Sequence, residues 1–211
     1  WRAAGIEIYR NFDFEDFSLP VYFYPWLNGE DLDWQSSFKY TDNNGHKNLL
    51  VHVGPEFFAY GARFKLLGSL GWGIWDRDGD KDSWQYALGL DVRFREFNLS
   101  GEYLSRKRDD VPLLGGGLAD GTNEGFYIKG KYTFSPKWAV VLKYSDVDLF
   151  LPGATQMLTD NYQTIALSLN YWLWEGASDI IPQVEWVDAE RSDGSATLKY
   201  FRWTIGWRTT F

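Results

Sequence analysis

The last fourteen residues of the chain, 198–211, alternate between two kinds of side chain. One phase carries Phe201, Trp203, Ile205 and Trp207, and the other carries polar or small residues such as Arg202. Because side chains on a strand point to opposite faces in turn, the pattern predicts a ribbon with one aromatic face and one polar face. Such a ribbon fits a soluble sandwich, with its apolar face in a core, or a membrane barrel, with that face against lipid.

The same alternation recurs through the chain and predicts about twelve strands, one of them over 32–40 and one over 48–66 with a bulge or kink at Gly54-Pro55. Short connections are predicted at 28–31, 66–69, 95–96, 135–137 and 174–179, with longer ones at the other end of the sheet. Alternating short turns and long loops are typical of membrane barrels. We therefore predict one domain over 1–211, an all-β transmembrane antiparallel up-and-down barrel with both termini in the periplasm.

Composition supports a lipid boundary. The chain has 12 Trp, 13 Tyr and 15 Phe but a single Met, and Trp and Tyr gather where proteins meet membrane interfaces. No stretch approaches the roughly 18 apolar residues of a membrane-spanning helix, so the apolar surface must come from strands. Cysteine is absent, which excludes disulfides and thiolate metal sites. No leader peptide is visible, and an outer-membrane location would require that one was removed.

The tryptophans divide between the two phases. Those of the apolar phase are predicted to form a lipid-facing girdle: Trp34, Trp72, Trp138, Trp186, Trp203 and Trp207. Trp26, Trp75 and Trp172 fall in or near the inward phase, where they would stack on a ligand or simply fill the lumen.

The polar phase collects basic residues, although the whole chain has a formal charge of −8. The predicted anion path consists of Lys39, Arg63, Lys65, Arg93, Lys129, Lys131, Lys143, Arg202 and Arg208. The predicted lumen acids are Asp91, Glu102 and Glu185. A basic lining in a low-dielectric wall concentrates anions and sets selectivity by charge. The alternative is that each base pairs with a wall acid and fills a narrow barrel.

Other chemistry has little support. His46 and His52 are the only histidines. His46 falls in a predicted loop with no second His paired with it, and His52 has Gly54 where a phospholipase-type site would have Ser, so no catalytic residue is assigned. Residues 76–82 resemble a calcium loop but lack the Glu that supplies bidentate ligation. We therefore expect no metal and no cofactor. The acidic balance disfavours nucleic-acid binding.

Two resemblances narrow the prediction. The ending at Phe211 resembles that of bacterial outer-membrane proteins, and the resemblance implies that Phe211 is the signal read by the barrel-assembly machinery. Residues 125–211 resemble the end of the phosphate-selective porin family, through GFYIKGKY at 125–132, SPKW at 135–138, KYS at 143–145 and LSLNYWL at 167–173. Those porins are longer, so the chain is either a smaller relative or the C-terminal part of a larger porin barrel.

We expect a passive diffusion channel for small polar, anion-leaning solutes in the outer membrane of a Gram-negative bacterium. Loops such as 105–123 would fold inward and narrow it. The expected partners are outer-membrane lipid, the assembly machinery and the solutes, with a homo-oligomer or a periplasmic or surface protein as further possibilities. The alternative function is a structural barrel that sheathes or anchors a partner protein without conducting solute.

Overall fold

The computed structural model describes residues 5–28, 47–74, 81–152, 157–174, 178–195 and 197–209, and these residues form an all-β fold. Its strands are β1 Gly5–Asp13, β2 Phe17–Asn28, β3 Lys47–Val53, β4 Glu56–Ala59, β5 Ala62–Ile74, β6 Asp82–Phe94, β7 Phe97–Pro112, β8 Leu118–Ser135, β9 Trp138–Pro152, β10 Met157–Trp174, β11 Ser178–Arg191 and β12 Thr197–Thr209. In this part of the chain no helix is long and apolar enough to cross a membrane.

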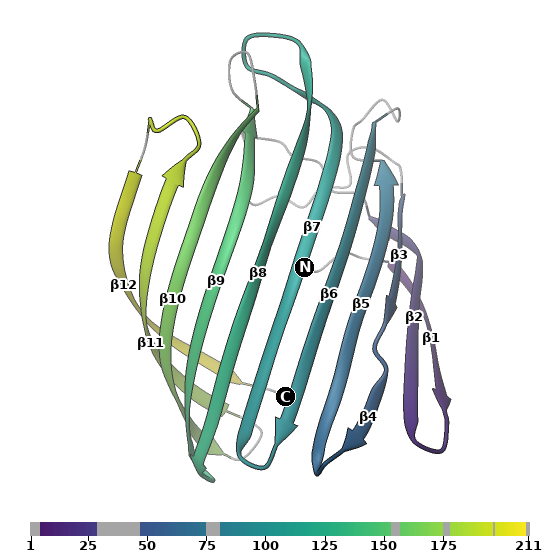
Figure 1. Cartoon of the computed structure of the whole chain (residues 1–211), viewed down its shortest axis with the longest axis vertical. Helices are drawn as coiled ribbons and strands as arrows, with labels where there is room; N and C mark the ends of the chain where they lie inside the picture. Colours follow the sequence, from purple (N-terminus) through teal and green to yellow (C-terminus); the bar gives the residue numbers. More distant parts are fainter. Residues whose placement is uncertain are drawn as a thin grey trace.

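All twelve strands belong to one antiparallel sheet in which neighbours in sequence are neighbours in space (Figure 1). The predicted all-β fold and up-and-down order are thus confirmed. In the described part, β1 pairs only with β2 and β12 pairs only with β11, so the predicted contact between the first and last strands is not among these pairs. The described sheet is a curved wall with two free edges.

The N-terminal third differs from the predicted strand order. β2 pairs directly with β3, so the two strands that flank the predicted strand 32–40 are themselves neighbours, and 32–40 lies outside the described residues. β3 and β4 form one pass across the sheet, which makes eleven passes among the described residues. With this odd number, β1 begins at one end of the described sheet and β12 ends at the other. The placement of both termini in the periplasm stays a prediction.

The chain reverses at Tyr60-Gly61, where both residues have positive φ (51° and 75°), and not at the predicted connection 66–69. Two consecutive residues with positive φ are typical of the tight hairpin turns that suit twisted strands. Gly68 had suggested a turn, but it lies inside β5, where a Cβ would come within 3.3 Å of the Val53 side chain. Gly68 therefore permits close packing of β3 on β5. The predicted break at Gly54-Pro55 is confirmed.

The predicted inward loop 105–123 is mostly strand. β7 continues to Pro112 and β8 starts at Leu118, so the connection between the strands is the tip at 113–117. The ladder has one irregularity, a register shift between Arg108 and Val111 at which Asp110 has a positive φ of 54°. The three glycines at 115–117 belong to the tip of the hairpin, and the residues on either side of it are strand. The strands pair as far as Pro112 with Leu118, which extends the sheet as a hairpin instead of closing over it.

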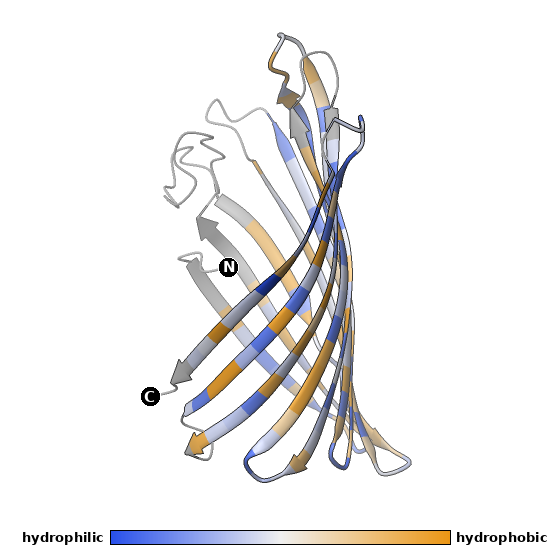
Figure 2. Ribbon diagram, turned by 90° about the vertical axis from the view of Figure 1, so that its left-hand side faces the viewer, coloured by the Kyte–Doolittle hydropathy of each residue, from blue (hydrophilic) through white to orange (hydrophobic). Residues whose placement is uncertain are grey.

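The sheet is curved, and hydrophobic and hydrophilic residues alternate along its strands (Figure 2). Its two faces therefore differ in polarity, and they differ in burial as well. The apolar face carries large exposed side chains, such as Leu142 and Leu167 at 57% and 48% exposure. The polar face carries crowded small or polar side chains, such as Ser100 and Ala139 at 7% and 0%. Side chains crowd on the inside of a curved sheet, so the polar face is the concave one. Exposed apolar and buried polar side chains are the reverse of a soluble domain.

Candidate functional site

Charged side chains of the polar face gather in two adjacent rows that cross the sheet from β4 to β12. The first row, in which each residue is the direct pairing partner of the next, is Glu56, Lys65, Asp91, Ser100, Lys129, Lys143, Ala166, Glu185 and Arg202. The second row is Arg63, Arg93, Asn98, Lys131, Val141, Ser168, Gln183 and Thr204. Directly paired residues share a face, so both rows lie on the concave wall. Seven of their side chains are basic and three are acidic.

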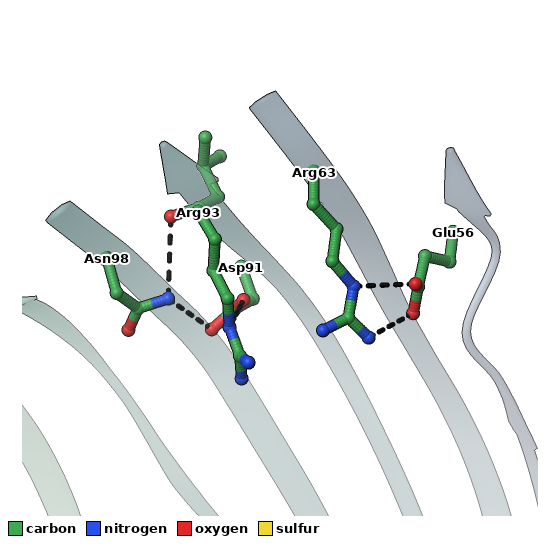
Figure 3. Close-up of polar contacts among 6 residues, drawn as sticks. Glu56, Arg63, Asp91, Arg93 and Asn98 are labelled. Atoms are coloured by element: carbon green, nitrogen blue, oxygen red, sulfur yellow. Dashed lines mark hydrogen bonds and ion pairs between the residues drawn. The ribbon is translucent and has the colours of Figure 1, made fainter. Parts of the chain in front are cut away.

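The arginines of these rows contact carboxylates. Arg63 on β5 donates from Nε and Nη2 to the two carboxylate oxygens of Glu56, at 2.6 and 2.5 Å (Figure 3). Arg93 Nε lies 3.2 Å from Asp91 Oδ1, and Asn98 Nδ2 donates to the other oxygen of Asp91 at 2.9 Å. The two-point contact between Arg63 and Glu56 is the strong, geometrically specific form of ion pair.

The same arrangement recurs at the far end of the first row. Arg202 Nε on β12 donates to Glu185 Oε2 at 2.6 Å, and Gln183 Nε2 donates to Glu185 Oε1 at the same distance. Both oxygens of this buried carboxylate therefore accept hydrogen bonds. Arg63, Arg93 and Arg202 therefore each contact a wall acid, as the alternative of bases paired with wall acids predicts.

Two lysines of the first row, Lys129 and Lys143, differ from the arginines. Lys129 and Lys143 are direct pairing partners on β8 and β9, and among the described residues neither forms an ion pair. Lys143 Nζ instead lies 5.3 Å from the centroid of the Tyr127 ring, and Lys131 Nζ lies 4.7 Å from that of Trp172. Like charges placed directly opposite each other destabilise a sheet, so this pair keeps a positive field on the wall at a cost in stability.

Some predicted site residues cannot be placed. Lys39, Trp34 and Phe211 lie outside the described residues, as does Trp75. Arg208 pairs with Asp179 in β11, which puts its backbone in the polar phase. The remaining predicted lumen residues, including Glu102 on β7, all lie on the polar face. Sequence reasoning missed Glu56, because the turn at Tyr60-Gly61 that brings β4 beside β5 was not recognised.

Aromatic side chains on the apolar face form two boundaries. The upper one descends from Trp72 and Trp84 (rings 6.3 Å apart) through Tyr103 and Phe126 to Trp186 and Phe201 (4.7 Å). The lower one descends from Phe97 and Tyr132 (4.6 Å) to Trp138 and Tyr171 (4.5 Å), with Trp207 beside them. Both boundaries step down the sheet in the same direction, as expected when tilted strands cross a flat membrane.

The spacing of the two boundaries fits a bilayer. Phe126 and Phe134 are eight residues apart on β8, or about 26 Å along a strand and roughly 20 Å in height at a tilt of about 40°. Trp72, Trp138, Trp186 and Trp207 lie at the boundaries, whereas Trp203 lies between them, with 79% exposure.

Beyond the upper boundary the apolar face becomes polar. Asn161 Nδ2 lies 2.7 Å from Asp146 Oδ1 and 2.8 Å from Asp148 Oδ1. Lys199 Nζ lies 2.6 Å from Asp188 Oδ2. These charges mark the part of the sheet that projects past the apolar band.

His52 is held on the polar face. Its Nδ1 lies 2.7 Å from Ser69 Oγ, its direct pairing partner, and its ring centroid lies 5.6 Å from that of Tyr22. The contact binds β3 to β5 across the wall.

No family model matches the chain, so membership of the phosphate-selective porin family is not shown. No curated protein matches it. Among solved structures, the chain resembles the outer membrane channel DcaP of Acinetobacter baumannii, with a TM-score of 0.54 and 14% sequence identity over 97% of this chain. The chain spans 62% of the length of that channel. At this identity the likeness concerns the fold: an antiparallel meander sheet of the kind that an outer membrane channel uses.

Proposed function

We propose that the chain forms the wall of a water-filled channel in the outer membrane of a Gram-negative bacterium, through which small polar solutes, preferentially anions, diffuse passively. One observation carries the proposal: the sheet combines an apolar face, bounded by two rows of aromatic rings, with a concave polar face. On that concave face Lys129 and Lys143 form no ion pair within the described part of the chain. The likeness of fold to an outer membrane channel supports it.

The mechanism is electrostatic. A low-dielectric wall focuses the field of the lysines into the water beside it, which raises the local concentration of anions. The arginines contribute less to this field because Glu56, Asp91 and Glu185 lie against them. No tight binding site is required, since a solute must leave as readily as it enters.

The test is ion conductance of the purified protein in a planar bilayer, with the reversal potential measured under a salt gradient. The variant is Lys129→Glu, Lys131→Glu and Lys143→Glu. A matched control, Lys81→Glu, Lys107→Glu and Lys137→Glu, makes the same change in net charge outside the band between the aromatic rows. We expect a discrete conductance whose anion preference collapses in the wall variant and persists in the control.

Two outcomes contradict the proposal. Absence of conductance in a protein that has folded into the membrane would exclude the channel. A conductance with no anion preference, or equal loss of preference in the wall variant and the control, would exclude the role of the wall lysines.

A further inference from the structure

Tyr127 lies between a wall lysine and a wall acid on the polar face. Glu102 on β7 is its direct pairing partner on one side, and Ser145 on β9 on the other. Lys143, two residues before Ser145, places its ammonium group 5.3 Å from the centre of the Tyr127 ring. Tyr127 thus lies on β8, the strand between the one that carries Glu102 and the one that carries Lys143.

The nature of a cation's neighbour decides how much of its charge a passing solute meets. A carboxylate in contact cancels the field of the cation at a distance, as Glu185 does for Arg202. An aromatic ring attracts an ammonium group through its quadrupole but carries no net charge, so the full positive charge remains on the wall. Without an aromatic ring to attract its ammonium group, a flexible lysine side chain would form an ion pair with a carboxylate that it can reach.

Resting on the channel function proposed above, we propose that Tyr127 is a positioning residue that sets anion selectivity. Its ring holds Lys143 beside Lys129 and prevents Lys143 from pairing with Glu102. The wall therefore has two kinds of base: arginines whose charge is offset by carboxylates, and the pair Lys129 and Lys143, whose charge is retained. Selectivity depends on the second kind.

The experiment compares anion-to-cation permeability ratios, from reversal potentials, in four variants. Tyr127→Leu removes the ring and should lower the ratio by roughly two- to fivefold, the factor that corresponds to an exposed cation–π contact. Tyr127→Phe keeps the ring without the hydroxyl and should retain the wild-type ratio. Lys143→Gln should lower the ratio. Adding Tyr127→Leu to Lys143→Gln should cause no further loss, because both changes remove the same contact between Lys143 and the Tyr127 ring.

A rescue variant identifies the mechanism. In the Tyr127→Leu protein, Glu102→Gln removes the acid that would capture Lys143, and the anion preference should return. The control for a general effect on the barrel is Tyr132→Leu, which removes a ring from the apolar face of the same strand. Its ratio should equal that of the wild type. Migration of unheated and heated samples on gels checks that each variant has folded.

The outcomes separate the two proposals. A wild-type protein without conductance or anion preference would contradict the channel function itself. A wild-type anion preference that survives Tyr127→Leu, or that Glu102→Gln fails to restore, would overturn the role of Tyr127 and leave the channel function intact.

Discussion

Leu142→Arg tests whether the apolar face of the sheet contacts lipid or water. Leu142 lies on the apolar face of β9 with 57% of its side chain exposed, and its pairing partner is Gly130 on β8. Gly130 lies halfway between Phe126 and Phe134, the aromatic residues that bound the band on that strand. Leu142 is therefore at the middle of the proposed bilayer.

The two environments predict very different costs. An exposed leucine on a soluble protein can become arginine for about 0.5 kcal/mol or less, because its side chain already meets water. On the lipid face of a membrane barrel, arginine at the bilayer midplane costs about 2–4 kcal/mol. At room temperature this corresponds to a factor of roughly 30 to 1,000 in the folding equilibrium.

The assay is denaturant-dependent folding into phospholipid vesicles, followed by tryptophan fluorescence and by mobility of unheated samples on gels. Leu114→Arg is the matched control, because Leu114 is 82% exposed at the tip of the β7–β8 hairpin, beyond the band. We expect a loss of about 2–4 kcal/mol for Leu142→Arg and of at most about 0.5 kcal/mol for Leu114→Arg. Equal, small losses would refute the assignment of the apolar face to lipid.

Three further predictions follow from contacts elsewhere in the sheet. Gly125→Ala should destabilise the protein by about 1–3 kcal/mol, because the added Cβ would lie 2.7 Å from a backbone oxygen of β9. Gly130→Ala should be tolerated, because the added Cβ would have no atom within 4 Å; vesicle-based unfolding compares the two variants, and equal stabilities would contradict the prediction. Glu56→Gln removes the carboxylate that Arg63 contacts and should raise the anion-to-cation permeability ratio; a ratio unchanged or lowered would show that this arginine does not face the solute path. Lys107 Nζ lies 2.8 Å from a carboxylate oxygen of Asp109 and of Asp120, and these two carboxylates raise the pKa of Lys107. Lys107→Ala removes this bridge and should accelerate amide hydrogen exchange at the β7–β8 tip; unchanged exchange would show that the bridge does not stabilise the tip.

Alternation along the sequence was sufficient to predict the all-β fold and the two faces. It placed Lys129, Lys131 and Lys143 in one phase and Trp186 in the other, and the register of β8, β9 and β11 puts them on opposite faces as expected. This succeeds because a strand has a side-chain period of two whatever lies beside it. The short connection at 95–96 was predictable for the same reason, since the alternation stops there and resumes.

Strand ends were predicted less well. The turn at Tyr60-Gly61 lacks the Asn-Gly or Asp-Gly signal of tight hairpins, and Gly68 gave a false one. The hairpin at 105–123 continues past the apolar band, where water on both faces removes the alternation that marks a strand. These features depend on which backbone groups find partners across the sheet.

The sequence by itself determined which side chains share a face, because that depends only on the geometry of a strand. Only the tertiary structure decided which charges of that face meet. Arg93 and Lys129 are indistinguishable as basic residues of the polar phase, yet one lies against Asp91 and the other faces Lys143. Their neighbours come from pairing between strands, and a shift of register by two residues would keep every face and change every partner. The charge that a solute would meet is therefore a property of the register.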